Sequence, residues 1–145
     1  MKKFISSVSI FLLVLLFINC SGSDPAPEKI TESVIIDKVA KSSGITRSQA
    51  QIGLSALMKL SEEKLSPEEF TTLNKDFPGG DNLYKFASDL GFNNGTIKTQ
   101  ADIVQILVNL GVNPVDAGKF LSSVLSVSKN LEGGVSELIS KVYER

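Results

Sequence analysis

Residues 44–61 read GITRSQAQIGLSALMKLS, and this stretch predicts both the start and the buried face of a long helix. Thr46 and Gln49 have the spacing of a capping box, in which each side chain accepts a hydrogen bond from the backbone of the other residue. Behind this cap, one face repeats at steps of three and four residues: Ala50, Leu54, Leu57 and Ser61. We therefore expect a helix that begins after Thr46 and ends near Glu63.

The rest of the chain from Ile30 onward also has helical spacing, with no sustained alternation of period two. Helix caps, prolines and glycines divide it into further predicted helices. Their expected ranges are 31–41, 66–75 with Ser66 as cap, 81–90 with Asp81 as cap, 100–110 with Thr99 as cap, 113–131 with an Asn-Pro start, and 135–143. The sequence thus predicts an all-α fold, a compact bundle of six to seven short helices.

The segment Gln100 to Leu110 is apolar almost all round, with Gln105 and Asn109 as its only polar positions past Asp102. A helix of this kind is normally buried, so we expect it at the centre of the bundle. The preceding turn-rich segment Phe92 to Lys98 has no apolar period, which predicts a mobile loop.

A weak internal repeat appears at a shift of 67 residues, where residues 111–128 (GVNPVDAGKFLSSVLSVS) align with residues 44–61. Both copies run from glycine through a cap into a helix, and each follows an apolar helix. One interpretation is two related halves, each a helix-corner-helix unit, around the buried central helix. The other is that helix corners look alike because they obey the same capping rules.

The amino-terminal residues have the pattern of a secretory signal. Lys2 and Lys3 precede an apolar run over residues 10–18 (IFLLVLLFI), which is shorter than the ~20 residues that a membrane-spanning helix needs. We therefore interpret residues 1–19 as a signal peptide, residues 20–29 as a tether and residues 30–145 as the folded domain. The alternatives are a buried core helix or an anchor that stays uncut.

The single cysteine, Cys20, directly follows this apolar run, in the sequence LFINCSGS over residues 16–23. This arrangement resembles the lipobox of bacterial lipoproteins, although Phe17 and Asn19 differ from the usual residues at their positions. The resemblance implies cleavage before Cys20, lipidation of its thiol and acylation of the new amino terminus, which would attach the protein to a membrane. Ser21 in the next position favours the outer membrane by the same resemblance. The alternative is a chance cysteine near an ordinary cleavage site, for example after Gly22.

The composition excludes several kinds of chemistry. The chain has no His and one Cys, so it has no histidine-dependent nucleophile, no histidine metal ligand and no intrachain disulfide. It has 15 basic against 16 acidic residues, and removal of Lys2 and Lys3 with the signal leaves 13 against 16, a net charge of −3. This balance gives no electrostatic basis for binding nucleic acid.

Caps, stops and core positions along the domain form a pattern shared with a known family: Gln49-Ala50, Gly53, Leu57, Leu60, Leu65-Ser66, Phe70, Leu73, Pro78-Gly79, Leu110-Gly111 and Gly133-Gly134. In these positions the chain resembles the VcgC/VcgE family of unknown function. The resemblance implies an all-helical envelope or secreted protein, and it supplies no functional residue.

Few side chains could carry chemistry. The two glutamate pairs, 62–63 and 68–69, could form an acidic cluster, but helix capping already accounts for the second pair. Residues 76–82 (DFPGGDN) read as a helix corner with Phe77 beneath it, and Gly53 inside a helix indicates close approach of a neighbouring helix. The remaining groups are expected to be solvated: the serine pairs 42–43 and 122–123, and the cations Lys38, Lys41 and Arg47.

These observations predict no catalytic residue, no metal and no cofactor, with Cys20 as the one modified site. The leading hypothesis is a lipid-anchored envelope domain, non-enzymatic, that binds another protein or the envelope. The alternative, suggested by the apolar helix over residues 100–110, is a carrier of a small apolar ligand such as a lipid. An envelope hydrolase would need a carboxylate pair in one cleft.

Overall fold

The computed structural model describes residues 29–145. Cys20 and the predicted signal and tether up to residue 28 lie outside this range. Every regular element in the described residues is an α-helix, which confirms the predicted fold class. The elements are α1 (Glu32–Ser43), α2 (Arg47–Lys64), α3 (Pro67–Asp76), α4 (Gly80–Asp89), α5 (Gln100–Asn109), α6 (Pro114–Ser128) and α7 (Val135–Glu144).

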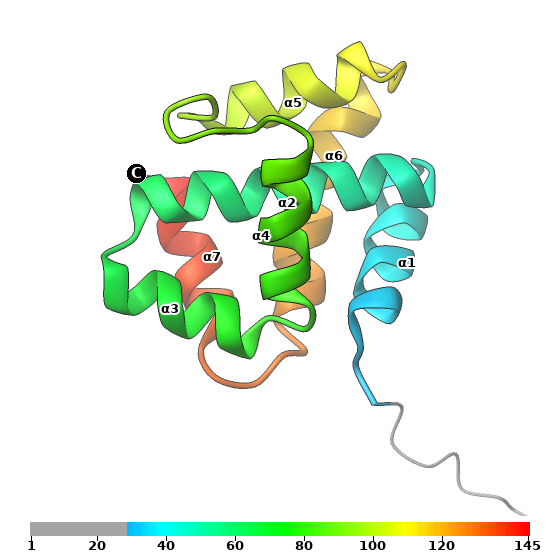
Figure 1. The fold of residues 1–145 in the computed structure, drawn as a ribbon. Helices are drawn as coiled ribbons and strands as arrows, with labels where there is room; N and C mark the ends of the chain where they lie inside the picture. The colour runs from blue at the N-terminus through cyan, green and yellow to red at the C-terminus, as the bar shows by residue number, and fades with distance from the viewer. Residues whose placement is uncertain (1–28) are drawn as a thin grey trace, which may run out of the picture.

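Helix α2 is the centre of the bundle, and it contacts each of the other six helices (Figure 1). Nine consecutive residues, Gly53 to Ser61, are buried, so this helix is covered on all sides. The prediction that the helix over residues 100–110 is central was therefore wrong. Helix α5 lies at an edge of the bundle, and Ile103 and Leu107 are its only fully buried residues.

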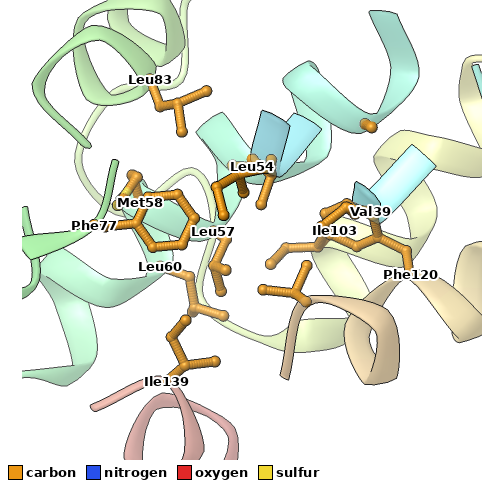
Figure 2. Close-up of a cluster of buried hydrophobic side chains, with 14 of the residues drawn as sticks. Val39, Leu54, Leu57, Met58, Leu60, Phe77, Leu83, Ile103, Phe120 and Ile139 are labelled. Carbon is orange, nitrogen blue, oxygen red and sulfur yellow. The ribbon is translucent and has the colours of Figure 1, made fainter. Parts of the chain in front are cut away.

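The apolar core surrounds α2 and receives side chains from all seven helices. Figure 2 shows Leu54, Leu57, Met58 and Leu60 of α2 among side chains from the surrounding elements. The seam predicted on this helix is confirmed, since all of its members are buried: Ala50, Leu54, Leu57 and Ser61.

Most predicted caps are confirmed. Thr46 and Gln49 form the capping box of α2, and Ser66 and Glu69 form that of α3. Thr99 caps α5 in the same way, together with Asp102. These side chains satisfy backbone N–H groups that have no partner inside the helix.

The start of α4 differs from the prediction. Its N-cap is Gly79, with φ of 79°, and no side chain caps it. Asp81 lies inside the first turn, where its carboxylate accepts a hydrogen bond from Asn74. A carboxylate at this position still interacts favourably with the helix dipole. The left-handed conformation of Gly79 is one that glycine adopts without strain.

One helix boundary and one loop residue also differ from the sequence-based expectation. Helix α6 ends at Ser128 rather than near Leu131, with residues 129–134 forming the turn before α7. The segment Phe92 to Lys98 was predicted as a mobile loop without an apolar period; it is a loop, but its Ile97 is only 1% exposed. The backbone N–H of Gly95 also donates to Glu63 Oε1 at 2.8 Å. One buried residue, which periodicity does not reveal, thus attaches this loop to the core.

Helices α2 and α6 cross at Gly53, the position where the sequence indicated a close neighbour. A Cβ atom at this position would lie 2.6 Å from Cζ of Phe120, which is completely buried. The absence of a side chain is therefore what lets the Phe120 ring lie against the backbone of α2.

Substituting this glycine tests the crossing. Glycine inside a helix usually costs about 1 kcal/mol relative to alanine. Gly53→Ala should nevertheless destabilise the domain by about 1–3 kcal/mol, because the added methyl group overlaps Phe120. The measurement is the free energy of unfolding in urea.

Gly118→Ala is the matched control, since Gly118 lies inside α6 and a Cβ there would meet nothing within 4 Å. This substitution should stabilise the domain by about 0.5–1 kcal/mol. Equal effects of the two substitutions would contradict the assigned crossing.

Candidate functional site

The two helix corners predicted from the repeat lie side by side and enclose an open cleft of about 440 Å³. One corner joins α1 to α2, and the other joins α5 to α6. The cleft is lined by Gly44, Ile45, Thr46, Gln49, Gly111, Val112, Asn113 and Asp116. These eight residues form four pairs, and the members of each pair are separated by the 67 residues of the repeat.

The paired positions have equivalent roles. Gly44 and Gly111 both have positive φ, at 77° and 86°. Thr46 caps α2, and Asn113 caps α6. Deeper in the bundle, Ala50 and Ala117 are both buried, as are Leu57 and Val124. Shared capping rules explain the glycines and caps, but they do not explain why the two corners pack against each other. The interpretation as two related halves would explain both the shared caps and the packing of the two corners, and it stays a prediction.

Hydrogen bonds across and along the cleft occupy its polar side chains. Gln49 accepts from the backbone N–H of Thr46 at 2.9 Å, and its amide nitrogen donates to the carbonyl oxygen of Leu110 at 3.0 Å. This second bond joins the start of α2 to the end of α5, so one side chain connects the two corners.

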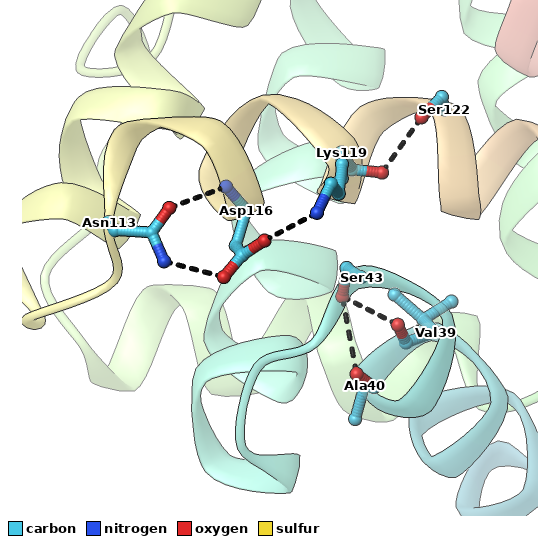
Figure 3. Close-up of polar contacts among 7 residues, drawn as sticks. All are labelled: Val39, Ala40, Ser43, Asn113, Asp116, Lys119 and Ser122. Atoms are coloured by element: carbon cyan, nitrogen blue, oxygen red, sulfur yellow. Dashed lines mark hydrogen bonds and ion pairs between the residues drawn. The ribbon is translucent and has the colours of Figure 1, made fainter.

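Asp116, the counterpart of Gln49, is also fully engaged. It accepts from Lys119 Nζ at 2.9 Å and from Asn113 Nδ2 at 2.5 Å, beside the end of α1 (Figure 3). These bonds lower the pKa of the Asp116 carboxyl, the bond from Lys119 most strongly. The polar side chains at the cleft are thus used to cap and join helices.

The outer side of α5 is the second notable surface and borders this cleft. We call it the α5 face and define it by Ala101, Val104, Gln105, Val108 and Asn109. Ala101, Gln105 and Asn109 are exposed, and the two valines are half-buried. At 100° per residue these five positions occupy one side of the helix, opposite Ile103 and Leu107. The face carries no charged residue.

Apolar exposure continues at the carboxyl end of α5. Leu110 is 40% exposed, and Val115 in the first turn of α6 is 67% exposed. No charged residue occurs from Ile103 to Val115. Depletion of charge together with exposed apolar atoms is typical of the core of a protein–protein interface.

The acidic cluster that the two glutamate pairs could have formed is absent from the described residues. Glu62 accepts from the hydroxyl of Tyr84 at 2.7 Å, and Glu63 accepts from the loop at Gly95. Glu69 pairs with Lys141 of α7 and with the backbone of Ser66. Each of these carboxylates therefore joins two elements of the fold. Within residues 29–145, no three potential Cys, Asp or Glu ligands gather as a metal site would require.

Sequence reasoning missed one buried cation. Lys59 of α2 is only 5% exposed, and its ammonium nitrogen lies 3.7 Å from the ring centroid of Tyr84. The same nitrogen is 3.4 Å from Glu62 Oε2, so ring and carboxylate together compensate the buried charge. The available signal was that Lys59 is the only charged residue between Ser48 and Ser61.

The other candidate side chains have structural roles. Residues 76–82 form a helix corner with Phe77 buried beneath it, as predicted. The serine pairs were expected to be solvated, but Ser43 and Ser123 are buried. Ser43 donates to the carbonyl oxygen of Val39 at 2.6 Å, which satisfies its hydroxyl within α1. Ser42 and Ser122 are exposed.

The three cations near the first corner do not converge on an anion site. Arg47 pairs with Asp37 and donates to Ser33 Oγ at 2.9 Å, which joins the start of α2 to α1. Lys38 and Lys41 lie on the exposed side of α1.

Comparison with known proteins identifies one family. The model for a protein of unknown function, VcgC/VcgE, matches residues 21–100. The match includes the first helix corner and ends at the first residue of α5, so the motifs at Leu110-Gly111 and Gly133-Gly134 lie beyond it. No curated protein and no solved structure matches the chain significantly.

The contact between Glu69 and Lys141 predicts a pH dependence of stability. The ammonium group of Lys141, followed by the backbone N–H of Ser66, lowers the pKa of Glu69 from 4.5 to about 2. A carboxyl whose pKa is lower in the folded state stabilises the fold above its unfolded pKa, and this stabilisation is lost as the pH falls through the folded pKa. The free energy of unfolding should therefore fall between about pH 4.5 and pH 2.

Replacing the carboxylate isolates this contribution. Glu69→Gln keeps a capping side chain for α3, so its unfolding free energy should vary less than that of the wild type over this pH range. Glu68→Gln, one residue away on the exposed side of α3, should leave the wild-type profile unchanged. Chemical denaturation at a series of pH values measures the free energy of unfolding of the wild type and of both variants. Parallel pH profiles of the wild type and Glu69→Gln would show that the contact between Glu69 and Lys141 contributes nothing to stability.

Proposed function

The chain belongs to the VcgC/VcgE family of unknown function, and on that premise we propose that it is a lipid-anchored lipoprotein of the bacterial cell envelope. Its helical domain acts without catalysis, as a docking module for another protein. The observation that carries the docking role is the charge-free α5 face, and the anchor is proposed from the amino-terminal sequence.

The proposed anchor is Cys20. A basic start, a short apolar run and this cysteine occur in the order that lipoprotein processing requires. No helix within residues 29–145 has the length and apolar character to cross a bilayer. A cysteine that carries two or three acyl chains would hold the protein firmly, because a single chain gives only marginal binding. The residue that follows, Ser21, favours the outer membrane.

The docking role rests on how the fold uses α5. This helix is apolar on nearly all sides, but only Ile103 and Leu107 are fully buried. Val104, Ile106 and Val108 are half-buried against the core and keep part of their surface exposed. A partner that covers the α5 face and the exposed Leu110 and Val115 would remove the remaining apolar surface from water. The carrier alternative depended on α5 being buried at the centre of the bundle, so the observed position of this helix gives it no support.

The absence of catalysis is proposed from the site chemistry. The carboxylates that could have served a hydrolase point into separate contacts: Glu62 toward Tyr84, Glu63 toward Gly95 and Glu69 toward Lys141. The polar side chains of the cleft are used as helix caps. No carboxylate pair in these two regions faces a common substrate space, which a glycosidase mechanism would need.

The anchor is tested by Cys20→Ala in cells. The wild-type chain should fractionate with membranes and gain mass from acyl chains. Cys20→Ala should lose that added mass and the firm membrane association. Ser23→Ala, three residues further along, serves as the control and should behave as the wild type. Intact-protein mass spectrometry and membrane fractionation give the two readouts. A Cys20→Ala protein of wild-type fractionation and mass would overturn the anchor.

A further inference from the structure

The loop between α4 and α5 contains the one Asn-Gly pair of the chain, Asn94-Gly95. Asparagine is a chemically labile residue, and it is especially so before glycine, because glycine has no Cβ atom to keep its backbone nitrogen away from the preceding side chain. Both Asn93 and Asn94 are exposed, but Asn93 is followed by another asparagine. Loss of a side-chain amide is therefore expected at the second of the two residues.

The structure holds the Asn-Gly pair in a tight turn. The backbone N–H of Thr96 donates to the carbonyl oxygen of Asn93 at 3.0 Å, so Asn94 and Gly95 are the two central residues of a β-turn. Gly95 has φ of 77°, the positive value that a type II turn requires at its third position. In Figure 1 this turn lies on the outside of the bundle, in the loop that leads to α5. Water thus has access to Asn94.

One carboxylate contacts the nitrogen that would react. The backbone N–H of Gly95 donates to Oε1 of Glu63, in the last turn of α2, at 2.8 Å. Direct hydrogen-bond contact with the proton to be removed is the geometry that a general base needs. This proton lies in the plane of the peptide group, whereas the nitrogen attacks a carbon atom from the face of that plane. Glu63 can therefore take the proton without blocking the attack.

We propose that Asn94 is a site of spontaneous deamidation, with Glu63 as the base. The backbone nitrogen of Gly95 attacks Cγ of Asn94 while its proton passes to Glu63. The new N–Cγ bond closes a five-membered succinimide ring, the Cγ–Nδ2 bond breaks, and the side-chain nitrogen takes the proton from Glu63 and leaves as ammonia. Water then opens the ring at either carbonyl group, which gives aspartate or isoaspartate at position 94.

The reaction would change how the loop is attached. Either product adds a negative charge next to the residue whose N–H contacts the carboxylate of Glu63, and like charges repel. Isoaspartate also adds a methylene group to the backbone within the turn. The bond from Gly95 to Glu63 and the buried side chain of Ile97 are two contacts that attach this loop to the bundle. Deamidation should therefore loosen the segment that precedes α5, once in the lifetime of each chain.

Ageing of the purified full chain in detergent at neutral pH tests the site. Peptide mass spectrometry should find a gain of one mass unit, the replacement of an amide by an acid, and fragment ions should place it at Asn94. Asn93, exposed in the same turn, is the internal control and should keep its amide. Asn94→Gln should remove the gain, because the longer side chain would have to close a six-membered ring.

The role of the base is tested by Glu63→Gln, whose amide oxygen can accept the same hydrogen bond but is not a base. The deamidation rate should fall about tenfold, less than the effect of a base that an enzyme has tuned to its reaction. Glu68→Gln removes the same charge from an exposed position on α3 and should leave the rate unchanged. In concentrated urea, where the contact is lost, the wild type and Glu63→Gln should deamidate equally fast.

Three results would overturn the proposal. Equal rates for the folded wild type and Glu63→Gln would exclude Glu63 as the base, and a faster rate in the variant would show that the hydrogen bond protects the turn. A difference in rate that persists in urea would show that the folded contact is not its cause. Loss of the amide from Asn93 as fast as from Asn94 would contradict the assigned site. None of these outcomes depends on Cys20 or on the α5 face.

Discussion

The contact between Gly53 and the ring of Phe120 is the constraint on which the rest of the bundle depends. It determines how closely α2 and α6 approach, and these two helices begin at the two corners that enclose the cleft. Gly53 and Phe120 are also separated by 67 residues, the shift of the internal repeat. The two halves therefore meet at equivalent positions. The first half has a glycine there, with no side chain, and the second half has the large ring of a phenylalanine.

Local features of the fold were predictable from the sequence because they depend on neighbouring residues. The capping boxes at Thr46 and Ser66 require only two side chains three residues apart, and the structure has both. The close approach at Gly53 could be anticipated, because glycine inside a helix is unfavourable unless a neighbouring group occupies the space that a side chain would fill. The start of α4 at Gly79 could not, since Asp81 satisfies the same local rules for a cap.

Burial was harder to predict because it depends on which helices meet. Helix α2 contains Lys59 and several serines, and its mixed composition concealed its central position. Its buried serine at position 61 bonds a carbonyl of its own helix, and Lys59 lies over Tyr84, so these polar groups need no water. Helix α5 has the more apolar sequence but lies at the edge. Its apolar residues other than Ile103 and Leu107 reach the core only in part, as Val104, Ile106 and Val108 do.

The direction of α1 separates the attachment point of the tether from the cleft. The proposed tether joins this helix at its amino-terminal end, whereas the corner cleft lies at its other end, beyond Ser43. With 12 residues, α1 is about 18 Å long. A tether that arrives from Cys20, as proposed, would therefore reach the domain about one helix length from the cleft. The cleft and the adjoining end of α5 are thus separated from the attachment point by the whole of α1.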